Sequence, residues 1–175
     1  MANNYINNKE FYQLLVDYKE KCKEAKEQGK PVPQITNDIG KCFLMIAKRL
    51  SNKGNFVGYT YKDEMVGDAL ENCMVAIHSF DPEKSNNPFA YFTQIIWYAF
   101  LRRIEKEKKQ TYVKYKELEN MVFDDMLNDS IDSHGYENFD IQNEKMKPII
   151  EKFEKKQKKK KQKKSGLETF VEDDQ

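Results

Sequence analysis

Four carboxylates at close spacing are the first residues in this sequence that could do chemistry. They lie between positions 63 and 71 and are Asp63, Glu64, Asp68 and Glu71. Clustered carboxylates can bind the divalent ions that nucleases use. On a helix, however, they would lie opposite the apolar face, with no His in register and no second segment to close a pocket. We therefore expect a solvent-facing acidic surface, and neither enzymatic activity, catalytic residues, a metal nor a cofactor.

A second group combines aromatic, apolar and cationic side chains on one side of an expected helix. Its members are Tyr91, Phe92, Ile95, Ala99, Arg102, Arg103 and Lys106. Aromatic rings stack on the bases of single-stranded nucleic acid, while Arg and Lys bind phosphates. The other side is expected to face the core and carries Phe89, Thr93, Trp97, Phe100, Leu101 and Ile104. The alternative is that Tyr91, Phe92 and Ile95 pack beneath another helix, which composition alone favours.

The chain ends in LETFVEDDQ, which places Leu167, Phe170 and Val171 among acidic residues. A short motif of this kind can dock its apolar side chains in a pocket with a basic rim, and a solvated terminus is the alternative. The preceding block KKQKKKKQKK, residues 155–164, is expected to stay extended until it meets an anionic partner, because its lysines repel one another. It could contact phosphates or act as a spacer.

Helices must position these groups, because apolar residues recur at three-and-four spacing over most of the chain. The first expected helix runs from Asn8 to Glu27 and closes at Gly29, before a proline-containing linker. The second begins at a cap within residues 36–38 and ends in the glycine-containing loop 52–58.

The third expected helix opens at Thr60, with Asp63 completing a shortened capping box, and extends to Phe80. Asn87 should cap the fourth helix, whose first residue is Pro88 and which should end near residue 109. Residues 112–127 could form one more amphipathic helix, and residues 148–150 begin a short segment before the lysine block. The acidic stretch 124–140 is expected to be loosely structured.

The helical spacing indicates an all-α protein, and the composition allows one modest core. The chain has 175 residues, of which 39% are hydrophobic, and its net charge of +1 hides strong segregation of charge along the sequence. Cys22, Cys42 and Cys73 occupy apolar positions, so neither a disulfide framework nor a metal site is indicated. Such cysteines fit a reducing cytoplasm. Because no apolar stretch approaches the roughly 20 residues needed to cross a bilayer, we expect a soluble protein.

The stretch DEMVGDALENCMVAIHSFDPEKSNNPFAYFTQIIWYAFLRRI, residues 63–104, resembles the second conserved region of sigma-70 family transcription factors. In that region an acidic amphipathic helix leads through a Phe-Asp-Pro-type turn into an aromatic-rich helix. NNKE at residues 7–10, NF-GYT at residues 55–60 and the acidic-apolar ending are similar to late-transcription sigma factors of T-even-type bacteriophages. The resemblance is specific over residues 59–109, moderate at the tail and weak over residues 112–164.

The resemblance implies a compact helical domain of the sigma region 2 type with a largely flexible C-terminal extension. Residues 1–34 would form an N-terminal amphipathic helix and linker, and residues 35–110 the sigma-like domain. Residues 111–164 would be a helical and acidic, then lysine-rich, extension, and residues 165–175 a tail that binds a sliding clamp. The implied setting is the cytoplasm of an infected bacterial cell, with no membrane partner.

The implied partners are host core RNA polymerase, promoter DNA and the phage sliding clamp. Contacts to the coiled coil of the clamp domain in the largest polymerase subunit would come from Glu64, Asp68, Glu71, Met74 and Val75. The non-template strand of an AT-rich minus-ten element would meet Tyr91, Phe92, Ile95, Tyr98, Ala99, Arg102, Arg103 and Lys106, with Phe92 matching the family's base-stacking ring. Leu167, Phe170 and Val171 would engage the sliding clamp.

The sequence departs from housekeeping sigma factors in two ways. Ile95 and Ile96 replace a tryptophan pair, and Ala99 replaces a polar base-reading residue, which favours weak DNA opening or an easily opened AT-rich promoter. After Thr111 there is no room for a well-packed helix-turn-helix domain, so no minus-thirty-five element should be recognised. The alternative function is a helical adaptor that binds polymerase or nucleic acid without promoter specificity.

Overall fold

The computed structural model describes residues 6–127, 144 and 146–159, and within these ranges the fold is all-α. This confirms the predicted fold class. The chain divides into two compact units, Met1–Ile104 and Glu105–Gln175, which are described separately below. In the described ranges, none of the helices is both long enough and apolar enough to span a membrane.

Helix α1 spans Asn8–Glu27, the bounds predicted from the sequence. The Asn7 side chain caps it by accepting a hydrogen bond from the Lys9 amide at 3.1 Å. At the other end Gly29 adopts a φ of 65°, and the amide of Lys30 donates to the carbonyl of Ala25 at 2.8 Å. This is the Schellman arrangement, which requires a left-handed residue and therefore favours glycine.

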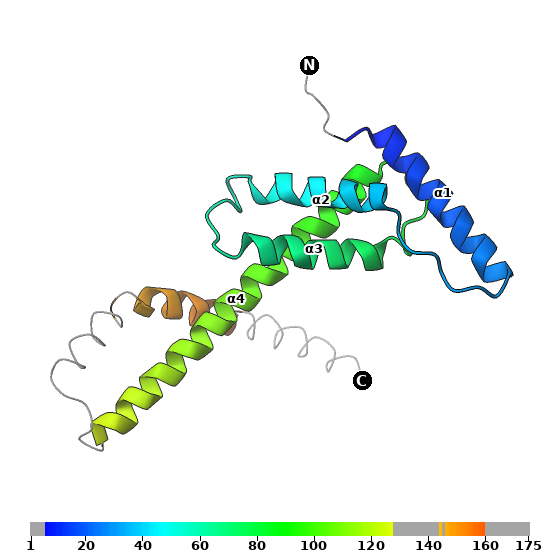
Figure 1. The fold of residues 1–175 in the computed structure, drawn as a ribbon. Coiled ribbons are helices and arrows are strands. Elements are labelled where there is room, and N and C mark those ends of the chain that lie inside the picture. Colours follow the sequence, from blue (N-terminus) through cyan, green and yellow to red (C-terminus); the bar gives the residue numbers. More distant parts are fainter. Residues whose placement is uncertain (1–5, 128–143, 145, 160–175) are drawn as a thin grey trace, which may run out of the picture. The chain divides into compact units, whose positions relative to one another are not determined.

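Helices α2 (Asn37–Ser51) and α3 (Lys62–Ala76) lie side by side and antiparallel (Figure 1). The predicted start and end of α3 were both wrong. Tyr61 is its N-cap and makes no side-chain capping bond, so the expected capping box at Thr60 does not form. The regular helix stops at Ala76, and a turn carries the chain to Phe80, which is nevertheless buried.

Helix α4 spans Pro88–Leu127. The Asn87 side chain accepts a hydrogen bond from the Ala90 amide at 3.1 Å, which confirms the predicted cap. The expected end near residue 109 was wrong, because residues 89–127 contain neither glycine nor proline and the helix continues. Residues 124–127 are therefore helical rather than loose, while the rest of the predicted acidic loop lies outside the described residues.

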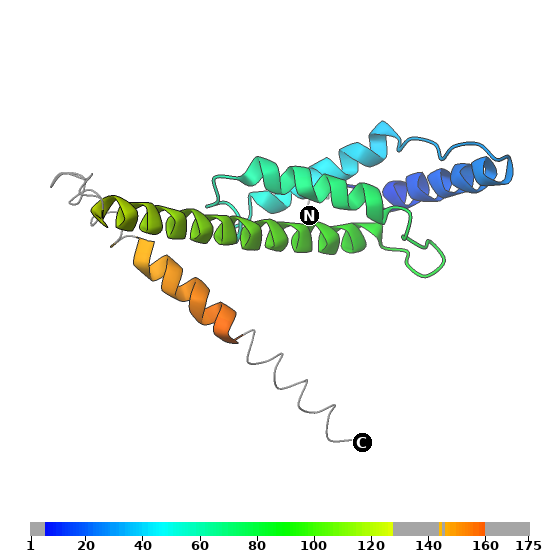
Figure 2. The same ribbon diagram turned by 90° about the horizontal axis from the view of Figure 1, so that it is seen from below.

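An aromatic cluster forms the core of the first unit. Phe92 of α4 packs against Phe43 of α2, with ring centroids 4.6 Å apart, and against Phe11 of α1 at 5.7 Å. Phe56, from the loop before α3, packs edge-on against Trp97 and Phe100. The first part of α4 crosses α2 and α3 in Figure 1 and runs along α3 in Figure 2. Rings from three helices and a loop thereby fix the rotation of α4 about its axis.

The second unit pairs the later part of α4 with a helical segment, residues 146–159. The rings of Tyr112 and Phe153 stack with their centroids 4.9 Å apart. Nζ of Lys156 pairs with Oε1 of Glu105 at 2.9 Å. The prediction that the lysine block is extended was wrong for residues 155–159, which are helical. Carboxylates offset the lysine repulsion there, since Glu151 also accepts from Lys155 at 3.4 Å. Residues 160–164 lie outside the described ranges.

Candidate functional site

A surface groove separates α3 from α4 within the first unit, with a volume of about 620 Å³. From α3 and the turn that follows it, the lining residues are Glu71, Asn72, Val75, Ala76 and Ser79. From α4 they are Tyr91, Ile95, Tyr98 and Arg102. The groove therefore combines residues predicted to bind polymerase with residues predicted to bind DNA.

The α4 side of the groove is a single helical stripe. Its members follow one another at spacings of four, three and four residues, which keeps them on one face. Tyr98 is 52% exposed, whereas Tyr91 is half-buried because its ring packs against Phe80 at 5.2 Å. The exposed ring of Tyr98 and the cationic Arg102 together offer base stacking and phosphate binding.

The α3 side offers an apolar surface bordered by acid. Val75 is 73% exposed, Met74 beside it is also exposed, and Glu64 and Glu71 point to solvent. An exposed valine and methionine next to carboxylates suit a protein partner that supplies both an apolar contact and a cation. The accessibility of these four predicted polymerase contacts agrees with the sequence analysis, and their binding stays a prediction.

Asp68 and Arg103, predicted to bind polymerase and DNA respectively, instead bind each other. Nε of Arg103 donates to Oδ2 of Asp68 at 2.7 Å, and Nη2 donates to Oδ1 at 2.8 Å. Their side chains are only 33% and 16% exposed. The expectation of solvent-facing contacts was therefore wrong for both, because the ion pair between α3 and α4 already satisfies them.

Phe92 and Ala99 are not on the exposed side of α4. Phe92 is 0% exposed at the centre of the aromatic cluster, and Ala99 is buried with it. The predicted core side was wrong in part as well, since Leu101 is exposed while Ile96 is buried. Phe92, Ile96 and Ala99 are spaced by four and three residues, so they define the buried face. The helix is therefore rotated relative to the expectation, and Phe92 has no surface on which a base could stack.

The remaining predicted residues lie elsewhere. Lys106 is exposed in the second unit. Leu167, Phe170 and Val171 lie outside the described residues. Across the described ranges, no group of three or more His, Cys, Asp or Glu side chains is arranged to hold a metal ion.

Sequence reasoning missed Asn72, Ala76 and Ser79, which line the groove. Asn72 has a defined part in it: its Oδ1 accepts a hydrogen bond from Nη2 of Arg102 at 2.6 Å. The sequence could have indicated Asn72, because it lies four residues after Asp68 and three before Val75, and this spacing puts all three residues on one helical face. Asn72 therefore orients the guanidinium of Arg102 at the edge of the groove.

Neither the protein-family models nor the curated proteins contain a match to this chain.

Proposed function

We propose that this protein is a sigma factor of the type that serves late transcription in T-even-type bacteriophages. It binds host core RNA polymerase through α3 and directs initiation at promoters whose AT-rich minus-ten element contacts α4. Its C-terminal tail engages the DNA sliding clamp for activation. The observation that carries the proposal is the α3/α4 groove, where an aromatic and arginine stripe lies beside an exposed acidic and apolar helix face.

Base stacking in this proposal belongs to Tyr98, supported by Tyr91, and not to the buried Phe92. Tyr98 is the more exposed of the two groove tyrosines, and Ile95 between them supplies an apolar floor for a flipped base. Arg102, held by Asn72, is positioned for a backbone phosphate. Rings beside a fixed cation are the elements that bind single-stranded nucleic acid.

The polymerase contact is assigned to Glu64, Glu71, Met74 and Val75. Reversing charge at Glu64 and Glu71 together should abolish binding to core polymerase, because lysines there would repel a basic partner surface. Both residues are exposed, so the core packing should not change, and circular dichroism must show that α3 tolerates a lysine in its first turn. Glu20→Lys with Glu24→Lys on α1, both exposed and outside the α3/α4 groove, is the charge-reversal control. Retained binding of the α3 variant at physiological salt would contradict the assignment.

Single-round transcription with core polymerase on a template carrying an AT-rich minus-ten element tests the proposal as a whole. A sigma factor gives a defined start, and moving the element should move that start by the same distance. The burial of Phe92 and Ala99 favours a second candidate, an adaptor without promoter specificity, because it removes two base-reading positions. An adaptor would bind polymerase yet produce no defined start.

The tail contact is tested separately. Leu167→Ala with Phe170→Ala should leave basal initiation unchanged and abolish stimulation by a sliding clamp, because a short motif gains most of its affinity from one or two apolar anchors. Stimulation acts by raising the local concentration of polymerase near clamp-bearing DNA. Thr169→Ala within the same segment is the control, and equal stimulation of all three proteins would reduce the tail to a solvated terminus.

A further inference from the structure

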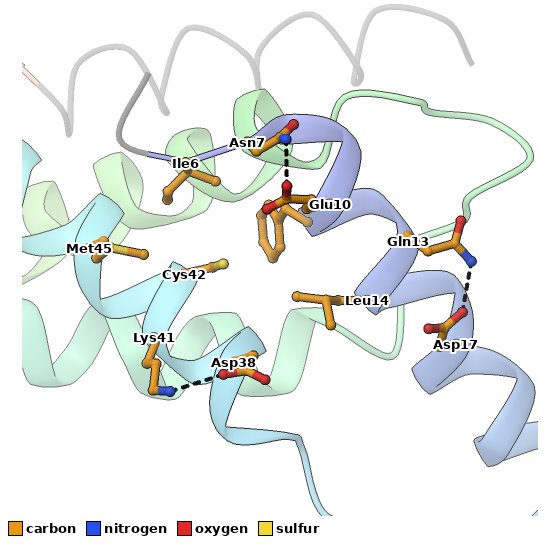
Figure 3. Close-up of a pocket in the computed structure, with 11 residues that line it drawn as sticks. Ile6, Asn7, Glu10, Gln13, Leu14, Asp17, Asp38, Lys41, Cys42 and Met45 are labelled. Carbon is orange, nitrogen blue, oxygen red and sulfur yellow. Dashed lines mark hydrogen bonds and ion pairs between the residues drawn. The ribbon is translucent and has the colours of Figure 1, made fainter. Parts of the chain in front are cut away.

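A second groove, of about 530 Å³, lies between α1 and α2, on residues to which the proposed function gives no part. Its apolar lining consists of Ile6, Phe11, Leu14, Cys42 and Met45. Figure 3 shows Leu14 from α1 and Cys42 and Met45 from α2 pointing into the same space. Met45 is 41% exposed. Its flexible thioether can adapt to the shape of a bound side chain, as in other methionine-containing protein grooves.

The rim of this groove is acidic. Glu10 and Asp17 come from α1 and Asp38 from α2, while Lys41 supplies the positive charge among the described lining residues. Three carboxylates against one ammonium leave a formal charge of −2. Glu10 and Asp17 accept hydrogen bonds only from neutral amides in the described contacts, those of Asn7 and Gln13 (Figure 3). Neither of these two charges is neutralised within the groove.

The field of these carboxylates reaches the groove floor. Burial first, and then the negative charges of Asp38 and Glu10, raise the pKa of the Cys42 thiol. Since Asp38 and Glu10 belong to different helices, their effects converge on the sulfur from both walls. An occupant that is anionic, such as a nucleic-acid backbone, would meet repulsion here.

We propose that the α1/α2 groove docks a short cationic amphipathic helix of another protein, with apolar anchors on the floor and Lys or Arg side chains at the acidic rim. The apolar floor fits the helix-in-groove mode of recognition. Charge complementarity selects the partner, because Lys41 pairs with Asp38 at 3.0 Å and leaves Glu10 and Asp17 to favour cations and disfavour acidic or phosphate-bearing ligands. This interaction is independent of promoter recognition.

Fluorescence anisotropy of the full chain with two labelled peptides tests the proposal. One peptide carries a leucine stripe at helical spacing with lysines on its flanks, and the other replaces every lysine with glutamate. The lysine peptide should bind at least about tenfold more tightly than its glutamate counterpart. Asp17→Asn with Asp38→Asn should weaken binding of the lysine peptide by about threefold to tenfold, and Met45→Gln should weaken that binding to a similar extent.

The control variants each remove a negative charge at a position outside the groove. Asp63→Asn matches Asp38→Asn, because each aspartate is the second residue of its helix, and Glu24→Gln matches Asp17→Asn on α1. Both control variants should bind the lysine peptide like wild type. Equal losses in groove and control variants, or binding insensitive to all of them, would overturn the proposal. Circular dichroism must show unchanged helicity for each protein compared.

Carbodiimide cross-linking without peptide distinguishes the other possible occupants. The proposal expects Asp17 and Asp38 to acquire no link to lysines outside α1 and α2. A link to another lysine of the same chain would mean that the protein occupies its own groove. A link between ¹⁴N-labelled and ¹⁵N-labelled copies would mean that a second copy does, and either result would overturn the proposal.

Discussion

Within the first unit, helix α4 has a buried face and a groove face. The two faces are similar in composition but differ in their surroundings. The buried face carries Phe92, Ile96 and Ala99, and the groove face carries Tyr91, Ile95 and Tyr98. Each contains an aromatic ring and an isoleucine four residues apart, and the faces are offset by one residue, or about 100° of rotation. Contacts from α1, α2 and α3 decide which face is core, so the sequence of α4 alone does not distinguish them.

The largest expected effect is loss of stability on Phe92→Ala. Removing a ring that contacts Phe11 and Phe43 should lower the free energy of unfolding by about 3 to 5 kcal/mol. Tyr98→Ala, on the other face, should change it by less than about 0.5 kcal/mol. Urea denaturation followed by circular dichroism measures both. Similar losses for the two variants would erase the distinction between the faces.

The next effect concerns DNA. Tyr98→Ala should weaken binding of the polymerase complex to a single-stranded minus-ten oligonucleotide by about 1 to 3 kcal/mol, or about 5-fold to 150-fold in Kd. Tyr98→Phe keeps the ring and should retain most of the affinity. If Tyr98→Ala binds like wild type, the groove face has no stacking role, whatever its exposure.

A smaller effect is expected from the Asp68–Arg103 ion pair, which joins α3 to α4. A double-mutant cycle of Asp68→Asn and Arg103→Gln, measured by urea denaturation, should give a coupling of about 1 kcal/mol, because the bidentate pair is only partly buried. The exposed pair Asp38–Lys41 provides the comparison cycle and should show weaker coupling. Equal coupling in the two cycles would mean that the Asp68–Arg103 pair has no special part in positioning α4.

The smallest effect is expected from Arg102→Gln. It should leave stability within about 0.5 kcal/mol of wild type and lower the slope of log affinity against log salt by about 1 for the oligonucleotide. Lys53→Gln, an exposed cation outside the groove, should leave that slope unchanged. A slope unchanged by Arg102→Gln would remove the phosphate contact from the proposed function.

Local signals predicted much of the fold. Gly29 and Asn87 mark helix ends through backbone or side chain, as predicted, and α1 begins and ends where the sequence indicates. The length of α4 was also predictable in principle, since no glycine or proline interrupts residues 89–127. The charged residues around position 109 do not end the helix, since a solvated helix tolerates them.

The rotation of α4 could not be predicted in the same way. Apolar residues occupy most of its circumference between residues 89 and 104, so periodicity permits more than one core face. Phe92 is buried by rings from residues 11 and 43, far away in sequence, and Arg103 is turned toward α3 by Asp68. The α1/α2 groove could not be predicted for the same reason. Its acidic rim combines residues of two helices, and their positions in the sequence do not reveal that the helices pack together.

The burial of the cysteines has a practical consequence for chemical labelling. Cys73 is completely buried, and burial raises the pKa of its thiol to about 12, so its thiolate fraction at pH 8 is on the order of 10⁻⁴. Cys42 is buried as well, which leaves the partly exposed Cys22 as the thiol most open to a maleimide. Once Cys22 is replaced, a cysteine introduced at the exposed position 74 should carry a fluorophore next to the α3/α4 groove with little background.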